Sequence, residues 1–134
     1  MLRGVGLFDD VFHTYYEEVD LCRRARLAGW RVALLTDAVI GHHGEGGTAG
    51  SAYRRRHMMR NKYYYLAADI DIPRPVQARI ALRWLARDLC GRGTGGESPI
   101  LTGIAETMGA LAWLARHCRT IGRRRRLHRA LRVR

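Results

Sequence analysis

The sequence predicts an α/β protein. Residues 1–68 should form a head in which a helix and two short strands complete part of a larger sheet, and residues 69–134 a helical, arginine-rich extension. Hydrophobic residues make up 47% of the 134 residues, enough for a packed core. In the head, apolar positions change from helical spacing to short β-branched runs. The charge is unevenly distributed along the chain: residues 1–50 carry a net charge of −2 and residues 51–134 a net charge of +14, for a total of +12.

The head opens with the loop "GVGLFDDVF" and continues into a predicted helix over about residues 17–28. Val19, Cys22 and Leu27 fall near one face of such a helix. Gly29 follows as the expected C-terminal stop, after several arginines suited to the negative end of the helix dipole.

Two short strands are predicted after this helix. "WRVALL", residues 30–35, is apolar and β-branched, and a turn at residues 36–37 separates it from "AVIGHH", residues 38–43. The glycine-rich run of residues 44–50 then predicts a flexible loop.

Three helices are predicted beyond this loop. The first covers about residues 51–68 and ends where the prolines of "DIDIPRP" interrupt the pattern. The second covers residues 76–89 and the third residues 99–118, joined by the linker "GRGTGGESP".

The composition argues against several classes of protein. Cys22, Cys90 and Cys118 form no Cys-x-x-Cys pair, which argues against a disulfide framework or a cysteine zinc site and fits a reducing cytosol. No secretory signal is visible. The longest apolar stretch, residues 100–115, is interrupted by polar residues and is shorter than the ~20 residues of a spanning helix. We therefore expect a cytoplasmic protein.

An unusual group of acids precedes the first helix. Glu17 and Glu18 are adjacent, and Asp20 follows two positions later. One interpretation is structural: helix N-termini stabilise nearby anions by roughly 0.3–1 kcal/mol, and Asp20 can pair with Arg24 four residues on. The other is a catalytic site, and the spacing alone leaves both open.

The surrounding residues favour the second interpretation. The head carries, in this order, Gly6-Leu7-Phe8-Asp9-Asp10, Tyr16-Glu17-Glu18-Val19-Asp20-Leu21, Arg24, Gly29-Trp30-Arg31-Val32, Thr36-Asp37-Ala38 and His42. Together these segments resemble the catalytic C-terminal half of family 2 glycosyltransferases, in particular the rhamnosyl- and galactofuranosyl-transferase-like branch. The resemblance covers residues 4 to about 66. It implies half of a GT-A-type, Rossmann-like sheet.

The activity that this resemblance implies is inverting transfer of a glycosyl group from a nucleotide-sugar to a saccharide or lipid-linked acceptor, in cell-surface polysaccharide synthesis. In such enzymes a carboxylate takes the proton of the attacking hydroxyl. The resemblance assigns this base to Glu18 and implies that Glu17 orients it or helps to hold metal or acceptor. Glu18 replaces the family's Asp. The extra methylene moves the carboxylate by about 1 Å, and misplacement on that scale can cost ~100-fold in rate.

Other residues of the head take supporting roles in this interpretation. Phe8, Asp9 and Asp10 belong to a loop on the acceptor side. Asp20 is the alternative carboxylate, but a structural role is favoured for it, tied to Arg24 or Arg23.

The two histidines that end the second predicted strand are candidates for the metal or the diphosphate. Adjacent residues of a strand point to opposite faces, so only one of the two can face a site. The resemblance favours His42, with His43 as the weaker candidate. A divalent metal, Mg²⁺ or Mn²⁺, is expected only together with the Asp-x-Asp strand of the family's N-terminal half.

That N-terminal half has no counterpart before Gly4. The Asp-x-Asp at residues 69–71 follows the carboxylate motif and is interpreted as a chance match in a turn. We therefore expect the chain to bind a nucleotide-sugar poorly alone. It is interpreted as the C-terminal piece of a glycosyltransferase, which leaves open a truncated reading frame, a split product or a domain that pairs with an N-terminal partner polypeptide.

The extension predicts an anionic partner. Its arginines accumulate after Glu106 without any acid, next to an apolar helix face. This pattern favours peripheral contact with an anionic membrane, at the inner face of the plasma membrane. Nucleic acid is disfavoured, because no aromatic residues for base stacking follow Trp113. The alternative function is accordingly a non-catalytic basic helical module that binds anionic membrane or nucleic acid.

Overall fold

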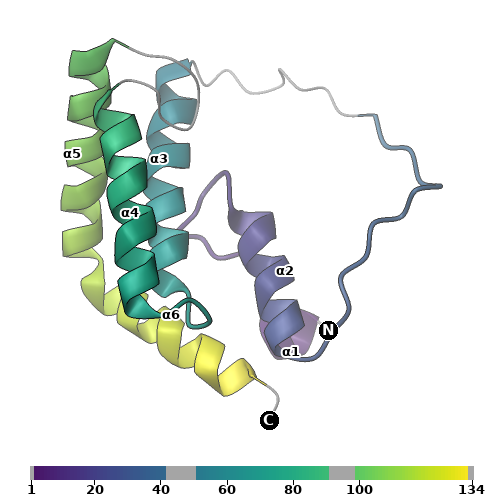
Figure 1. Ribbon diagram of the computed structural model, residues 1–134. Helices are drawn as coiled ribbons and strands as arrows, with labels where there is room; N and C mark the ends of the chain where they lie inside the picture. The colour runs from purple at the N-terminus through teal and green to yellow at the C-terminus, as the bar shows by residue number, and fades with distance from the viewer. Residues whose placement is uncertain (1, 42–50, 91–98, 133–134) are drawn as a thin grey trace.

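The computed structural model describes residues 2–41, 51–90 and 99–132, and these ranges are all-helical (Figure 1). The helices are α1 (Leu2–Val5), α2 (Glu17–Leu27), α3 (Ser51–Ala68), α4 (Arg74–Leu89), α5 (Ile100–Arg116) and α6 (Cys118–Leu131). The predicted α/β fold is wrong, since the described ranges contain no strand or sheet. The helices α2 to α5 lie where individual helices were predicted, and α6 lies within the predicted helical extension, whereas α1 has no predicted counterpart.

The missing sheet has a simple physical reason. Residues 30–41, which hold the first predicted strand and part of the second, form an exposed segment without regular structure. Leu34 is 88% exposed and Val39 95% exposed. A strand is stabilised by hydrogen bonds to a neighbour, and the described part of the chain offers this segment none. His42 and His43 lie outside the described residues.

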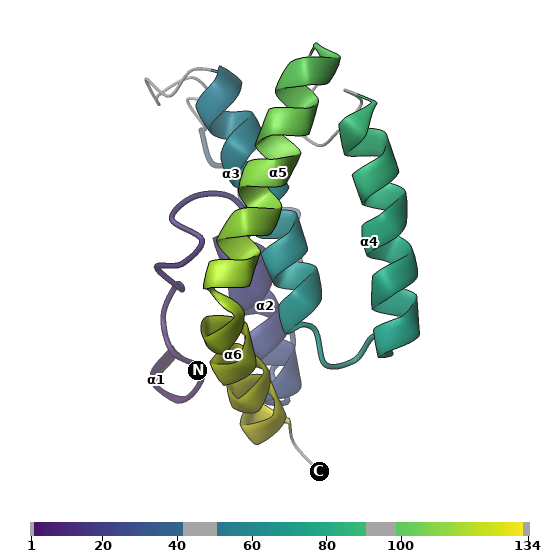
Figure 2. The same ribbon diagram turned by 90° about the vertical axis from the view of Figure 1, so that its left-hand side faces the viewer.

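The helix α3 is the centre of the bundle. It contacts α4, α5 and α6, and the two views show α4 and α5 standing beside it (Figures 1 and 2). The buried cluster contains Met59 and Tyr63 of α3 and Ala110 of α5, with Trp84 of α4 packed against it. These contacts cross the predicted boundary at residue 68, and the division into two parts stays a prediction.

A buried polar contact joins α3 to α4. Lys62 Nζ donates to Asp88 Oδ1 at 2.6 Å, and the Tyr63 hydroxyl donates to Asp88 Oδ2 at 2.7 Å. Burial lowers the pKa of Lys62, although the nearby carboxylate opposes this effect. These contacts of Asp88 fix α4 against α3, and burying the two charged groups costs desolvation free energy.

The helix α5 packs through its small side chains. Gly103, Thr107 and Ala110 are buried, so the larger residues Leu101 and Met108 remain 80% and 58% exposed. None of the helices in the described ranges is both long and apolar enough to cross a membrane.

Candidate functional site

The loop before α2 follows a strained path. His13, Tyr15 and Tyr16 have φ values of 61°, 62° and 76°, in the left-handed region that costs roughly 1–2 kcal/mol for a residue with a side chain. Such a loop persists only where neighbouring groups hold it.

Asn61 and Arg60 of α3 hold this loop. The buried Asn61 amide shares its hydrogens among the carbonyl oxygens of Phe12, Thr14 and Tyr15, at 2.9, 2.6 and 2.8 Å. Arg60 Nη2 adds a hydrogen bond to the Phe12 carbonyl at 2.9 Å. The central helix therefore positions the chain that leads into Glu17 and Glu18.

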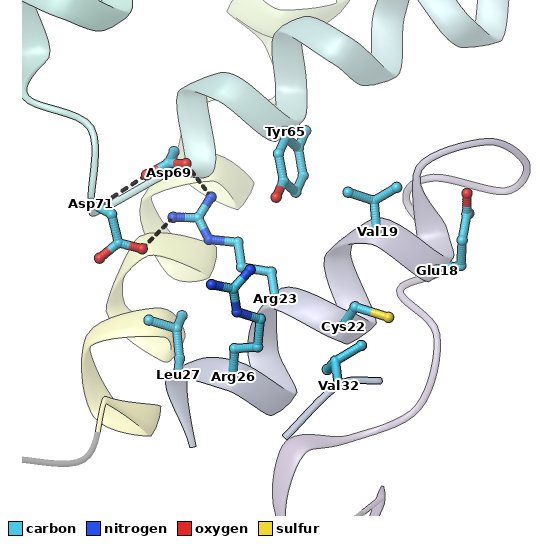
Figure 3. Close-up of a pocket in the computed structure, with 10 residues that line it drawn as sticks. All are labelled: Glu18, Val19, Cys22, Arg23, Arg26, Leu27, Val32, Tyr65, Asp69 and Asp71. Atoms are coloured by element: carbon cyan, nitrogen blue, oxygen red, sulfur yellow. Dashed lines mark hydrogen bonds and ion pairs between the residues drawn. The ribbon is translucent and has the colours of Figure 1, made fainter. Parts of the chain in front are cut away.

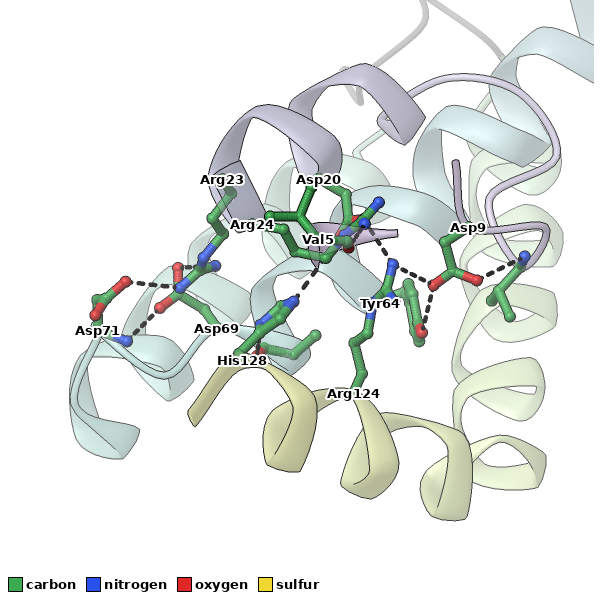
Figure 4. Close-up of polar contacts among 12 residues, drawn as sticks. Val5, Asp9, Asp20, Arg23, Arg24, Tyr64, Asp69, Asp71, Arg124 and His128 are labelled. Carbon is green, nitrogen blue, oxygen red and sulfur yellow. Dashed lines mark hydrogen bonds and ion pairs between the residues drawn. The ribbon is translucent and has the colours of Figure 1, made fainter. Parts of the chain in front are cut away.

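The first turns of α2 are anchored by Asp20 and Arg24, the pair expected from their spacing. Arg24 Nε donates to Asp20 Oδ2 at 2.8 Å, and both side chains are 1% exposed. The same guanidinium donates to the carbonyl oxygens of Val5 and Leu7. A single arginine thus ties α2 to the N-terminal segment (Figure 4).

Two side chains of α6 complete this buried network (Figure 4). Arg124 Nη2 lies 2.6 Å from Asp20 Oδ2 and 2.7 Å from Asp9 Oδ2, and His128 Nε2 lies 3.6 Å from Asp20 Oδ1. Burial alone would raise the pKa of Asp20. The His128 imidazole and the guanidinium groups of Arg124 and Arg24 outweigh burial and lower that pKa. The acidic head and the basic tail are therefore held together by the carboxylates of Asp20 and Asp9, of which Asp20 is the more buried.

The Asp-x-Asp of residues 69–71 also has a structural role. Arg23 of α2 lies 2.5 Å from Asp69 and 3.0 Å from Asp71. Asp69 Oδ1 accepts the backbone N–H of Asp71 at 2.7 Å, which closes the turn between α3 and α4. Arg132 pairs with Asp71 from the end of α6.

Glu18 stands apart from this network. It is exposed and makes no hydrogen bond or ion pair with a described residue. It lines a cavity of about 700 Å³ between α2 and the end of α3, together with Val19, Cys22, Arg23, Arg26, Leu27, Val32, Tyr65, Asp69 and Asp71. In Figure 3 it lies at the opposite end of this cavity from the Arg23–Asp69 pair. Its carboxylate is thus accessible beside a space large enough for a small ligand.

Glu17 faces a different cavity, of about 450 Å³, lined by Phe8, Asp9, Asp10, His13 and Glu17 itself. Glu17 Oε2 is buried and has no hydrogen-bond partner among the described residues. The structure therefore brings Glu17 together with the predicted acceptor-side loop, but places Glu18 beside a separate space.

Three of the four unpaired carboxylates in the described ranges share one region. Asp10, Glu17, Glu18 and Asp37 are the acids of the described ranges that make no ion pair. Asp10, Glu17 and Glu18 lie at the start of α2 and in the loop before it. This region can accept hydrogen bonds or a proton from a bound hydroxyl compound.

The described residues do not contain a metal site. No group of three or more histidine, cysteine or acidic side chains in these ranges could hold a metal ion. The predicted roles of His42 and His43 stay predictions, because both residues lie outside the described ranges.

The sequence analysis missed three residues that shape this region. Arg124 and His128 are separated from Asp20 by more than a hundred residues, and nothing distinguishes Arg124 from the other arginines of the tail. Asn61 lies within the predicted helix of residues 51–68, and its buried amide needs hydrogen-bond partners.

No protein-family model matches the chain, and comparisons with curated proteins and with solved structures also find no match.

Proposed function

We propose that the residues of this chain supply the acceptor-side carboxylates of a glycosyl-transfer site whose nucleotide-binding half lies outside them. One observation carries this proposal. In a chain of net charge +12, the exposed Glu18 has no cation paired with it among the described residues and lines a cavity of about 700 Å³. The ordered motifs of residues 4–66 support the same reaction.

In the proposed reaction, the Glu18 carboxylate accepts the proton of an acceptor hydroxyl while that oxygen attacks the anomeric carbon of the donor. The new glycosidic C–O bond forms as the bond to the nucleotide diphosphate breaks, with inversion. A positioned general base of this kind contributes typically 10²–10⁴-fold. Glu17 and Asp10 line the separate cavity of about 450 Å³, so they are not assigned to this proton transfer.

A divalent cation would offset the charge that develops on the leaving diphosphate. No group of the described residues could hold such a cation, so its ligands are assigned to residues outside the described ranges. No step of the proposed reaction is routed through metal bound to this chain.

Acceptor binding tests this proposal on the isolated chain. Methyl rhamnoside and methyl galactofuranoside, titrated by two-dimensional NMR, are expected to shift the amide signals of Glu18, Val19 and Tyr65. Nucleotide-sugars with Mn²⁺ are expected to give no calorimetric signal at micromolar concentration. Donor binding at that strength would contradict the assignment of the nucleotide-binding half to residues outside this chain. If neither acceptor shifts any amide signal, the acceptor-side role is contradicted.

A second proposal concerns the tail, which we infer makes peripheral contact with the inner face of the plasma membrane. The helix α6 divides its arginines: Arg124 faces the buried network, while Arg119, Arg123 and Arg126 are exposed on another face. The exposed apolar residues of α5 lie on the preceding helix. Each basic residue near an anionic bilayer contributes about 1 kcal/mol.

Vesicle co-sedimentation tests this second proposal. Replacing Arg119, Arg123 and Arg126 by Gln should weaken binding to phosphatidylserine-containing vesicles by about 100-fold. Replacing the exposed Arg79, Arg83 and Arg87 of α4 by Gln gives a control with the same loss of charge. Equal effects of both sets would contradict a specific role for α6, and tighter binding to RNA than to vesicles at the same salt would favour nucleic acid instead.

A further inference from the structure

We propose that the apolar cavity between α3, α4 and α5 binds the chain of a single-chain anionic amphiphile, such as a fatty acid. The cavity has a volume of about 430 Å³, within the range of roughly 300–1,000 Å³ typical of small-molecule sites. Its wall is formed mainly by Leu66, Ala81, Leu82, Leu85, Leu111 and Leu114. This site is separate from the carboxylates at the start of α2.

The cavity is open because small residues line α4 where it faces α3 and α5. Ala78 and Ala81 leave space that larger side chains would fill. Leu82 is 64% exposed and Leu111 36% exposed, so apolar surface on both sides of the cavity faces water. An alkyl chain would cover this surface, which is the main source of affinity for such a ligand.

The charge beside this cavity selects an anionic head group. Arg74 lines it and donates from Nη1 to Gln77 Oε1 at 3.2 Å, but it pairs with no carboxylate among the described residues. Gln77 is buried and donates to the Asp69 carbonyl oxygen at 2.7 Å, which fixes its position. Burial and then the nearby Arg74 lower the pKa of Arg125, although Asp69 opposes this effect, so two guanidinium groups lie near each other here.

Arg74 is also held in place by its neighbours. It lies between Pro73 and Pro75 at the first turn of α4, and proline fixes the local backbone. A carboxylate or phosphate at this position would accept charge-assisted hydrogen bonds, while its chain extends between α4 and α5.

The experiment uses the full chain, dansylaminoundecanoate as the fluorescent probe and monomeric dodecanoate as the competitor. We expect one probe per chain and its displacement by dodecanoate. Dodecanol and dodecyltrimethylammonium should compete at least about tenfold more weakly, because they lack the anion that Arg74 binds.

Variants test where the head group and the alkyl chain of the ligand bind. Arg74→Gln should weaken the binding of dodecanoate by about tenfold and leave the binding of dodecanol unchanged. Arg79→Gln, on the exposed surface of the same helix, should change neither. Ala78→Phe should abolish probe binding, and circular dichroism checks that its helices are intact; Ala78 is exposed, so its replacement should be tolerated.

Several results would overturn the proposal. These are equal binding of dodecanoate and dodecanol, equal effects of Arg74→Gln and Arg79→Gln, and full probe binding by Ala78→Phe. Binding of the probe only in the presence of phosphatidylcholine vesicles would instead assign the cavity to bilayer lipid. Dimerisation that the probe abolishes would assign it to a second copy of the chain.

Discussion

Replacement of Asp20 by Asn should destabilise the protein more than any surface substitution. The Asp20 side chain is 1% exposed and lies within 2.8 Å of nitrogen atoms of both Arg24 and Arg124. The substitution keeps the shape of the side chain but leaves two guanidinium groups and the His128 imidazole without their shared carboxylate. Removing one partner of a buried ion pair costs about 3–5 kcal/mol, a large part of the 5–15 kcal/mol that stabilises a typical domain.

The assay is urea denaturation followed by far-ultraviolet circular dichroism at neutral pH. Glu18→Gln is the matched control, because this exposed carboxylate has no described partner, and its free energy of unfolding should stay within about 0.5 kcal/mol of wild type. A loss below about 1 kcal/mol for Asp20→Asn would refute the inference that this carboxylate holds head and tail together.

The pH dependence gives a second check on the same residue. The folded pKa of Asp20 is lowered, so its stabilising contribution is fully present above the unfolded value of about 3.9. It is lost as the pH falls through the lower folded pKa. The difference in free energy of unfolding between wild type and Asp20→Asn should therefore shrink in acid, and a difference that stays constant with pH would contradict the assignment.

Three further substitutions test the packing around this network. Asp88→Asn removes the buried carboxylate that accepts from Lys62 and Tyr63 and should cost about 3–5 kcal/mol in a urea titration. Asn61→Ala removes the donor to three carbonyl oxygens of residues 11–16 and should cost about 1–3 kcal/mol; it should also speed hydrogen exchange in this loop more than elsewhere. Gly6→Ala should cost about 1–2 kcal/mol in thermal unfolding, because φ is +81° there, and an unchanged midpoint would contradict the left-handed conformation.

The helices could be predicted because their signal is local. Spacing of apolar residues and breakers such as Gly29 and Pro73 depends on a few neighbouring residues, and α2 and α3 begin where the pattern predicts. The strands could not be predicted in this way. Residues 30–35 have the composition of a strand, but a strand forms only when a neighbour accepts its hydrogen bonds, and composition does not report whether a neighbour exists.

In the candidate site, too, contacts between residues close in sequence could be predicted, whereas contacts between distant residues could not. The Asp20–Arg24 contact follows from four-residue spacing on a helix. The contribution of Arg124 depends on how α6 docks against α2, and a tail rich in arginine offers many equivalent alternatives. The separation of Glu17 and Glu18 into two cavities likewise depends on the strained loop before α2. The residues with positive φ in this loop are His13, Tyr15 and Tyr16, and no glycine there indicates a left-handed backbone.

Single-turnover glycosyl transfer by the Glu18→Gln variant tests the central claim most directly. The chain would be mixed with a separately produced nucleotide-binding half of a family 2 glycosyltransferase, a radiolabelled nucleotide-sugar, Mn²⁺ and saturating acceptor, with Asp37→Asn as the control for loss of an unpaired acid. We expect Glu18→Gln to lower the rate about 10²–10⁴-fold without changing acceptor binding, and Asp37→Asn to match wild type. A Glu18→Gln rate equal to wild type, or no transfer by any mixture, would contradict the account.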